Sequence, residues 1–128
     1  MRKFDVNFKK PSPEQLNSLA KYYQTGLYEN AEKLSLSITK EFPEHQFAWK
    51  VLGAVLKETG RISEALTTCQ KSVQLDPQDA EAHKNLGVIL QEQGRLNEAE
   101  LSYRKSIALK PDYAEAHINL ANTLNGQG

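Results

Sequence analysis

Histidine and cysteine are the side chains of this chain best suited to bind a transition metal ion such as zinc, and cysteine is its most reactive nucleophile. The 128 residues include three histidines and one cysteine, and His83 and His117 are 34 residues apart. Ligand nitrogens must lie within about 2.1 Å of one metal ion, whereas neighbouring helix axes are about 10 Å apart. The sequence contains no paired-cysteine motif, glycine-rich phosphate loop or nucleophile elbow. We therefore predict no catalytic residue, metal or cofactor, and interpret both histidines as partly buried packing residues.

Asparagine recurs at the same spacing. Asn85 and Asn119 are one interval apart, and Asn17 precedes Asn85 by two intervals, with Val51 at the position between them. An asparagine amide offers donors and an acceptor, so it can pair with any peptide group. On helices about 10 Å apart, such amides would meet about every third residue of a strand that rises about 3.3 Å per residue. The spacing suits recognition of an extended backbone, although similar asparagines also occur as plain helix-surface residues.

The composition excludes several classes of partner. The chain has 16 basic and 16 acidic residues and an isoelectric point near 6.8, so it lacks the positive charge with which proteins bind nucleic acids or anionic membranes. A hydrophobic share of 39% indicates a folded chain, and no apolar run approaches the roughly 18 residues of a membrane span. The single cysteine and the charged segment 1–10 favour a cytoplasmic protein with no disulfide and no signal peptide.

A 34-residue period organises the chain. Glycine, alanine and proline recur in register, at Gly26, Gly60, Gly94 and Gly128, at Ala31, Ala65 and Ala99, and at Pro43, Pro77 and Pro111. Self-similarity at such a period predicts a stack of repeats, none of which can bury its apolar face alone.

Each repeat has the pattern of two helices joined by a turn. Apolar residues recur at helical spacing up to a glycine, which tolerates a left-handed C-cap, and resume after it until a proline prevents continuation. Ser63 and Asn97 are predicted N-caps, and Ser12 with Gln15 predicts a capping box. Only the stretch 4–8 alternates like a strand. The predicted helices span residues 13–25, 29–41, 46–59, 63–75, 80–93, 97–109 and 114–125.

Small residues predict close packing within each repeat. We expect Gly53 and Gly87 to face the alanines of the following helix, Ala65 and Ala99, at an interaxial distance of about 8 Å. Cys69 is expected to be a buried thiol. The space between repeats should be filled by leucines, namely Leu52, Leu56, Leu86 and Leu90.

These residues resemble the tetratricopeptide repeat, a helix-turn-helix unit of 34 residues. The second unit carries Trp49, Leu52, Gly53, Leu56, Ala65, Ser72 and Pro77 at the family's positions, and the third carries Leu86, Gly87, Leu90, Ala99, Tyr103, Ser106 and Pro111. Cys69 and His83 depart from the pattern, since the family usually has an aromatic and a large apolar residue there. The resemblance implies an all-α, right-handed α-α superhelix. It divides the chain into an N-terminal arm (1–11), a divergent first repeat (12–45), two further repeats (46–79 and 80–113) and the first helix of a truncated fourth (114–128).

The resemblance also implies a function, because first helices in this family line a concave face that holds a segment of another protein. It gives as candidate partner-binding residues Asn17, Lys50, Lys84, Asn85, Asn119 and Asn122. The asparagines are similar to the ladder of O-linked N-acetylglucosamine transferases, interrupted by Val51. The chain departs from the carboxylate clamp of co-chaperone repeats, because Ala54 and Val88 stand four residues after Lys50 and Lys84 where that clamp has asparagine. The two lysines either contact an acidic partner or are simply solvated.

Two functions fit the sequence. The chain is a scaffold that binds a peptide or protein segment in its concave groove, or it is the non-catalytic, substrate-selecting N-terminal part of a larger enzyme such as a glycosyltransferase. The arm 1–11 contains Phe4 and Phe8 among basic residues. This arm either lies disordered or over the first repeat, or it is a docking segment.

The truncated fourth repeat predicts an exposed apolar end. We expect Leu120, Ala121 and Leu124 to face the third repeat, while Ile118 and parts of Leu120 and Leu124 are left more exposed than their counterparts, because no second helix follows. Such an end predicts self-association through residues 114–128 or a natural chain that continues.

Overall fold

The computed structural model describes residues 10–128, which are all-helical, without a strand in that range. The arm predicted at 1–11 lies outside the described residues, apart from Lys10 and Pro11. Seven helices were predicted and residues 10–128 form seven, each starting within one residue of its predicted position. They are α2 (Pro13–Gln24), α3 (Tyr28–Glu41), α4 (Gln46–Glu58), α5 (Ile62–Leu75), α6 (Ala80–Glu92), α7 (Leu96–Leu109) and α8 (Ala114–Gln127).

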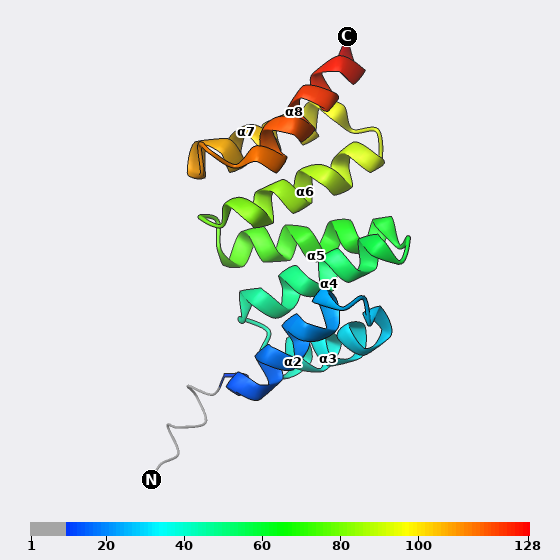
Figure 1. The fold of residues 1–128 in the computed structure, drawn as a ribbon, viewed down its shortest axis with the longest axis vertical. Helices are drawn as coiled ribbons and strands as arrows, with labels where there is room; N and C mark the ends of the chain where they lie inside the picture. The colour runs from blue at the N-terminus through cyan, green and yellow to red at the C-terminus, as the bar shows by residue number, and fades with distance from the viewer. Residues whose placement is uncertain (1–9) are drawn as a thin grey trace.

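The helices stack in two layers, in chain order from one end of the molecule to the other (Figure 1). Within residues 10–128, α2, α4, α6 and α8 each contact the next member of this set, whereas α3, α5 and α7 contact only members of the first set. The second layer is therefore more widely spaced than the first. The array curves with α2, α4, α6 and α8 on its inner side, as expected for an all-α helical repeat fold.

The predicted glycine C-caps are confirmed. Gly26, Gly60 and Gly94 have φ angles of 76°, 83° and 77°, in the left-handed region that side chains with a Cβ rarely adopt. At the two later turns, the residue after the glycine donates its backbone N–H back to the preceding helix, from Arg61 to Leu56 O at 2.8 Å and from Arg95 to Leu90 O at 2.9 Å. Each turn is therefore a compact reversal of the chain.

This reversal explains why two predicted N-caps were wrong. Helices α5 and α7 begin at Ile62 and Leu96 rather than after Ser63 and Asn97, with no side-chain cap. The glycine turn leads directly into the next helix, so the carbonyl of the arginine that follows the glycine accepts the first helical hydrogen bond. The capping box at the first helix is confirmed: Ser12 Oγ accepts from Gln15 N at 3.1 Å, and Gln15 Oε1 accepts from Ser12 N at 2.9 Å.

Each central glycine faces the middle of the following helix. A Cβ on Gly53 would lie 2.7 Å from Cys69 Sγ, and a Cβ on Gly87 would lie 2.6 Å from Tyr103 Cε1. The predicted opposition of these glycines to Ala65 and Ala99 was therefore wrong, although both alanines are fully buried. In an antiparallel helix pair, a residue near the start of the second helix lies opposite the end of the first, not its centre.

The core is shared between neighbouring repeats along the stack. Leu52 and Leu56 are buried with Ile89 of the next repeat, and Leu90 is buried with Tyr103. Leu66 and Leu86 pack against both of these clusters. The predicted sharing of the core between repeats is confirmed.

The last helix has an uncovered side. Ile118 and Leu124 are 60% and 40% exposed, as predicted, and Leu120 packs on the cluster around Tyr103. Ala121 was expected to face the third repeat but is exposed. Ala121 stands one period after Gly87. Its side of α8 therefore faces the position that the second helix of a complete repeat would occupy. None of the helices within residues 10–128 is long and apolar enough to cross a membrane.

Candidate functional site

The inner side of the array is hollowed across three repeats. We call this surface the inner groove; it is formed by α2, α4 and α6, and Cys69 of α5 and Glu115 of α8 also line it. One hollow of about 310 Å³ is lined by Ala20, Tyr23, Gln24, Phe47, Lys50, Val51, Ala54, Glu81, Lys84 and Asn85. A second, of about 180 Å³, shares four of these residues and is also lined by Gly53, Lys57, Glu58, Cys69, Val88, Ile89 and Glu115.

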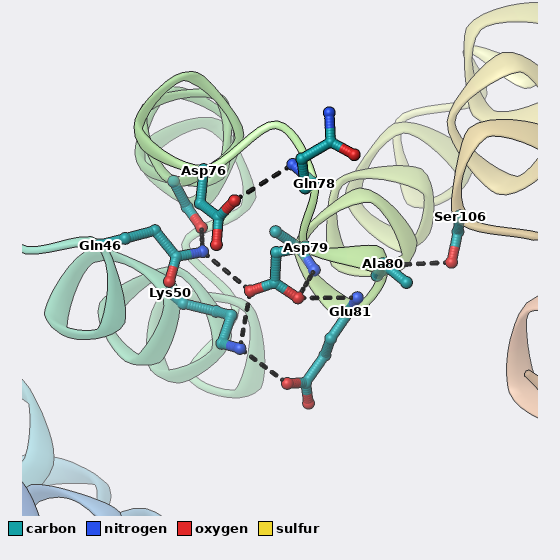
Figure 2. A network of polar contacts seen from close by, with 10 residues as sticks. Gln46, Lys50, Asp76, Gln78, Asp79, Ala80, Glu81 and Ser106 are labelled. Atoms are coloured by element: carbon teal, nitrogen blue, oxygen red, sulfur yellow. Dashed lines mark hydrogen bonds and ion pairs between the residues drawn. The ribbon is translucent and has the colours of Figure 1, made fainter. Parts of the chain in front are cut away.

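Lys50 is bound by the repeat that follows it. Its Nζ donates to Asp79 Oδ2 and to Glu81 Oε1, each at 2.9 Å (Figure 2). Burial disfavours the charged amine, yet the bonds to Glu81 and Asp79 outweigh it and raise the pKa of Lys50. With its side chain 18% exposed, Lys50 is not the solvated lysine of the sequence analysis.

Asp79 both caps a helix and joins two repeats. Its Oδ1 accepts the backbone N–H of Glu81 at 3.0 Å and that of Ala82 at 3.3 Å, at the start of α6. Its Oδ2 accepts from Lys50 and from Gln46 Nε2, the latter at 3.0 Å. Burial opposes ionisation, but the hydrogen bonds from Lys50 and Gln46 prevail and lower the pKa of this carboxyl. The carboxylate thus fixes α4 against the N-terminus of α6.

Lys84 also pairs with a carboxylate of the next repeat, but with only one and over a longer distance. Its Nζ lies 3.7 Å from Glu115 Oε2, and its side chain is 12% exposed. Both Lys50–Glu81 and Lys84–Glu115 join residues 31 apart, so each lysine pairs with the first turn of the next inner helix. The residue one period after Asp79 is Tyr113, which leaves Lys84 without an equivalent second carboxylate.

The predicted asparagines lie at different places. Asn85 is half-buried and lines both hollows of the inner groove. Asn119 is half-buried one period later on α8, and Asn122 is exposed there. Asn17 is exposed and lines a separate hollow between α2 and α3 at the first repeat. The structure thus brings Lys50, Lys84 and Asn85 together and leaves Asn17 apart.

The apolar lining of the groove was not predicted from the sequence. Tyr23, Phe47, Ala54 and Val88 all face it, and burial raises the pKa of the Tyr23 hydroxyl. Ala20, Ala54 and Val88 are one period apart, so the repeat register that led to the asparagines also contained these positions.

His83 and His117 each form a hydrogen bond within the protein, and Cys69 is buried. His83 Nε2 lies 2.9 Å from Pro77 O, and His117 Nε2 lies 2.8 Å from Pro111 O. His83 is buried but His117 is exposed, so partial burial was wrong for His117, which no helix within residues 10–128 covers. Burial raises the pKa of the Cys69 thiol to about 12. Within residues 10–128 no three His, Cys, Asp or Glu side chains are grouped to hold a metal ion.

Two family models match the chain. A model described as the tetratricopeptide repeat matches residues 80–113, and a model described as a TPR repeat matches residues 53–94. The chain contains tetratricopeptide repeats. A comparison with curated protein sequences gave no match.

Solved structures share the fold of this tetratricopeptide array. The first TPR of Spaghetti (RPAP3), bound to the HSP90 peptide SRMEEVD, has a TM-score of 0.84 at 18% identity, over 88% of this chain and 90% of that one. The Yersinia enterocolitica type III secretion chaperone SycD, in complex with a peptide of the translocator YopD, has a TM-score of 0.81 at 17% identity, over 90% and 93%. A mutant of the Thermobaculum terrenum O-GlcNAc transferase has a TM-score of 0.80 at 25% identity, over 97% of this chain and 23% of that one.

Proposed function

We propose that this chain is a protein-interaction scaffold whose inner groove binds an extended segment of a partner protein. The observation that carries the proposal is the half-buried amide of Asn85, which lines both hollows between apolar side chains. An amide of this kind pairs with a peptide group whatever the side chain. Two similar structures hold peptides of other proteins, as their descriptions state.

The charges of the groove favour a segment with little net charge. Lys50 and Lys84 are paired with carboxylates of the next repeat. An acidic peptide would have to displace these internal carboxylates, and it would meet Glu58, Glu81 and Glu115 along the same hollows. We therefore propose that affinity comes from backbone hydrogen bonds and apolar contacts rather than from capture of an acidic tail.

The test is selection from random-sequence peptides displayed on phage. Peptides enriched on the wild-type chain are synthesised and their dissociation constants measured by fluorescence anisotropy. We expect the selected peptides to bind the wild-type chain and to bind the Asn85→Ala variant more weakly. The control variant Asn30→Ala, at an exposed site on α3, should bind them like wild type. Binding that Asn85→Ala does not alter, or no enrichment at all, would overturn the proposal.

In a second candidate function, the same groove would select substrates as part of a larger enzyme. The Thermobaculum terrenum O-GlcNAc transferase matches nearly the whole of this chain over a small part of its own length. This observation supports an array that selects substrates for a larger enzyme. Co-purification of a transferase activity with the natural protein would favour it, and a natural protein with no such activity would favour the independent scaffold.

A further inference from the structure

The three repeats fill the space between their two helices differently. The central position of the first helix and the facing position of the second are Leu19 and Ser35 in the first repeat, and Gly87 and Tyr103 in the third. In each of these repeats one residue is large and the other small, and all but Gly87 are 0% exposed. The third repeat is filled by the Tyr103 ring, whose Cε1 would lie 2.6 Å from a Cβ on Gly87.

The second repeat has two small residues at these positions. Gly53 and Cys69 face each other, and both line the hollow of about 180 Å³ in the inner groove. The deep wall also includes Ile89, which is 1% exposed. The hollow therefore lies where the third repeat has an aromatic ring, and its lining also includes Ala54 and Val88.

We propose that the partner segment inserts one aromatic side chain, tyrosine above all, into this hollow, in the place that Tyr103 fills in the third repeat. The proposal rests on the binding function proposed above. We call the hollow the aromatic subsite, lined at its base by Gly53, Cys69 and Ile89.

The polar rim of the aromatic subsite suits a phenol. Tyr103 donates its hydroxyl to Gln91 Oε1 at 2.7 Å, and Lys57 stands one period before Gln91 and lines the subsite. A phenol oxygen can accept from a lysine at the corresponding place. The rim pairs Lys57 with Glu58 at 3.2 Å and Lys84 with Glu115 at 3.7 Å, so a neutral side chain disturbs neither pair.

Filling the subsite from within the chain tests the proposal. Cys69→Tyr supplies the ring in cis, whereas Leu101→Tyr puts the same ring at an exposed site on α7, away from the subsite. Peptides selected on the wild-type chain should share an aromatic residue, and their affinity should fall about tenfold or more with Cys69→Tyr, as expected for losing a buried aromatic side chain. Leu101→Tyr should change the affinity less than about twofold. Thermal unfolding of both variants checks that they fold.

The outcomes separate this proposal from the binding function. Selected peptides that lack a shared aromatic, or that bind folded Cys69→Tyr as well as wild type, would overturn the aromatic subsite and leave groove binding intact. The absence of any selected peptide would overturn the binding function instead.

The aromatic subsite can also be tested on the wild-type chain, so that the result does not depend on whether a variant folds. In amide NMR spectra, titration with 4-methylphenol, which is the tyrosine side chain, should shift Gly53, Ala54, Cys69 and Val88. The branched alcohol 3-methylbutan-1-ol should shift them less, because it lacks the flat ring. Shifts that lie elsewhere, or that are equal for the two compounds, would contradict an aromatic subsite.

Discussion

At the scale of single residues, the groove is organised by charges that are satisfied within the chain. Asp79 links Lys50 and Gln46 of one repeat to the first turn of α6 in the next (Figure 2). Charge-assisted hydrogen bonds of this kind stabilise more than neutral ones. Asp79 is therefore a structural residue at the edge of the binding surface, and its contribution depends on pH.

Asp79→Asn should destabilise the fold by about 1 kcal/mol at neutral pH, because asparagine keeps the helix cap but loses the charged bond to Lys50. The pKa of Asp79 is lowered from 3.8. Its ionised form therefore stabilises the fold fully above that ordinary value, and the contribution is lost as the pH falls through the lower, folded-state pKa. Urea unfolding of both proteins should show a difference at pH 7 that shrinks below about pH 3.5.

Glu115→Gln is the matched control for this prediction. It removes the pair between Lys84 and the exposed Glu115 carboxylate, 3.7 Å apart, which is worth about 0.5 kcal/mol or less. If Glu115→Gln lowered the free energy of unfolding as much as Asp79→Asn, the hydrogen bonds around Asp79 would stabilise the fold no more than an exposed ion pair.

The sequence predicted the positions of these residues better than their partners. The 34-residue register led to Asn85 and to the two lysines, and the structure puts all three in one hollow. The pairing of Lys50 with Glu81 spans 31 residues between neighbouring helices. Such a contact depends on how the two helices are placed relative to each other, which no local pattern encodes.

At the scale of helices, the contact between each glycine and the following helix governs packing. Gly87→Ala should destabilise the protein by about 1–2 kcal/mol, because its Cβ would meet the fully buried ring of Tyr103 and overpacking outweighs the gain in helix propensity. Gly53→Ala should cost less, because the closest atom that its Cβ would meet is the terminal Sγ of Cys69, beside the hollow. Denaturant unfolding of the two variants measures the difference.

Equal losses at the two glycines would contradict this account of the second repeat. They would mean that Cys69 is held as rigidly as Tyr103, with no space into which its sulfur can turn.

Helix positions could be predicted because glycine and proline mark each boundary and apolar spacing marks each interior. The caps could not all be predicted from residue type. Ser63 and Asn97 are good N-cap residues, but the left-handed glycines before them start α5 and α7 earlier. Turn geometry thus outweighed the preference of a single side chain.

At the scale of the whole molecule, the two ends of the stack are unlike its middle. Inner helices α4 and α6 are covered on both sides along the array, whereas α8, among the described residues 10–128, has only α6 and α7 beside it. The exposure of Ile118 and Leu124 follows from this position. We expect this end to be the site at which two chains associate.

Leu124→Lys tests that expectation. Sedimentation over a range of concentrations should show the mass of the wild-type chain rising, and the variant remaining a monomer, because a lysine in the contact would have to lose its hydration. Leu101→Lys, at a 69% exposed site on α7, is the control and should behave like wild type. A wild-type chain that stays monomeric throughout would leave α8 as a simple end cap.

The two-layer stack and its shared core followed from the period alone. The direction of Ala121 was contained in the period as well, because Gly87 one period earlier faces the following helix, although we expected Ala121 to face the third repeat. The local depth of the groove was also unforeseen, since it arises from the coincidence of Gly53 and Cys69 on two facing helices.

The central claim is that the inner layer of helices binds a partner backbone through asparagine, at Asn85 in the inner groove and at Asn119 one period later on α8. The most direct measurement is the dissociation constant of several unrelated selected peptides for the wild type and for the Asn85→Ala, Asn119→Ala double variant. Each lost hydrogen bond is worth about 0.5–1.5 kcal/mol, so every peptide should bind about tenfold more weakly to the variant, while Asn30→Ala has no effect. Unchanged dissociation constants for the double variant would place the binding surface elsewhere on the molecule.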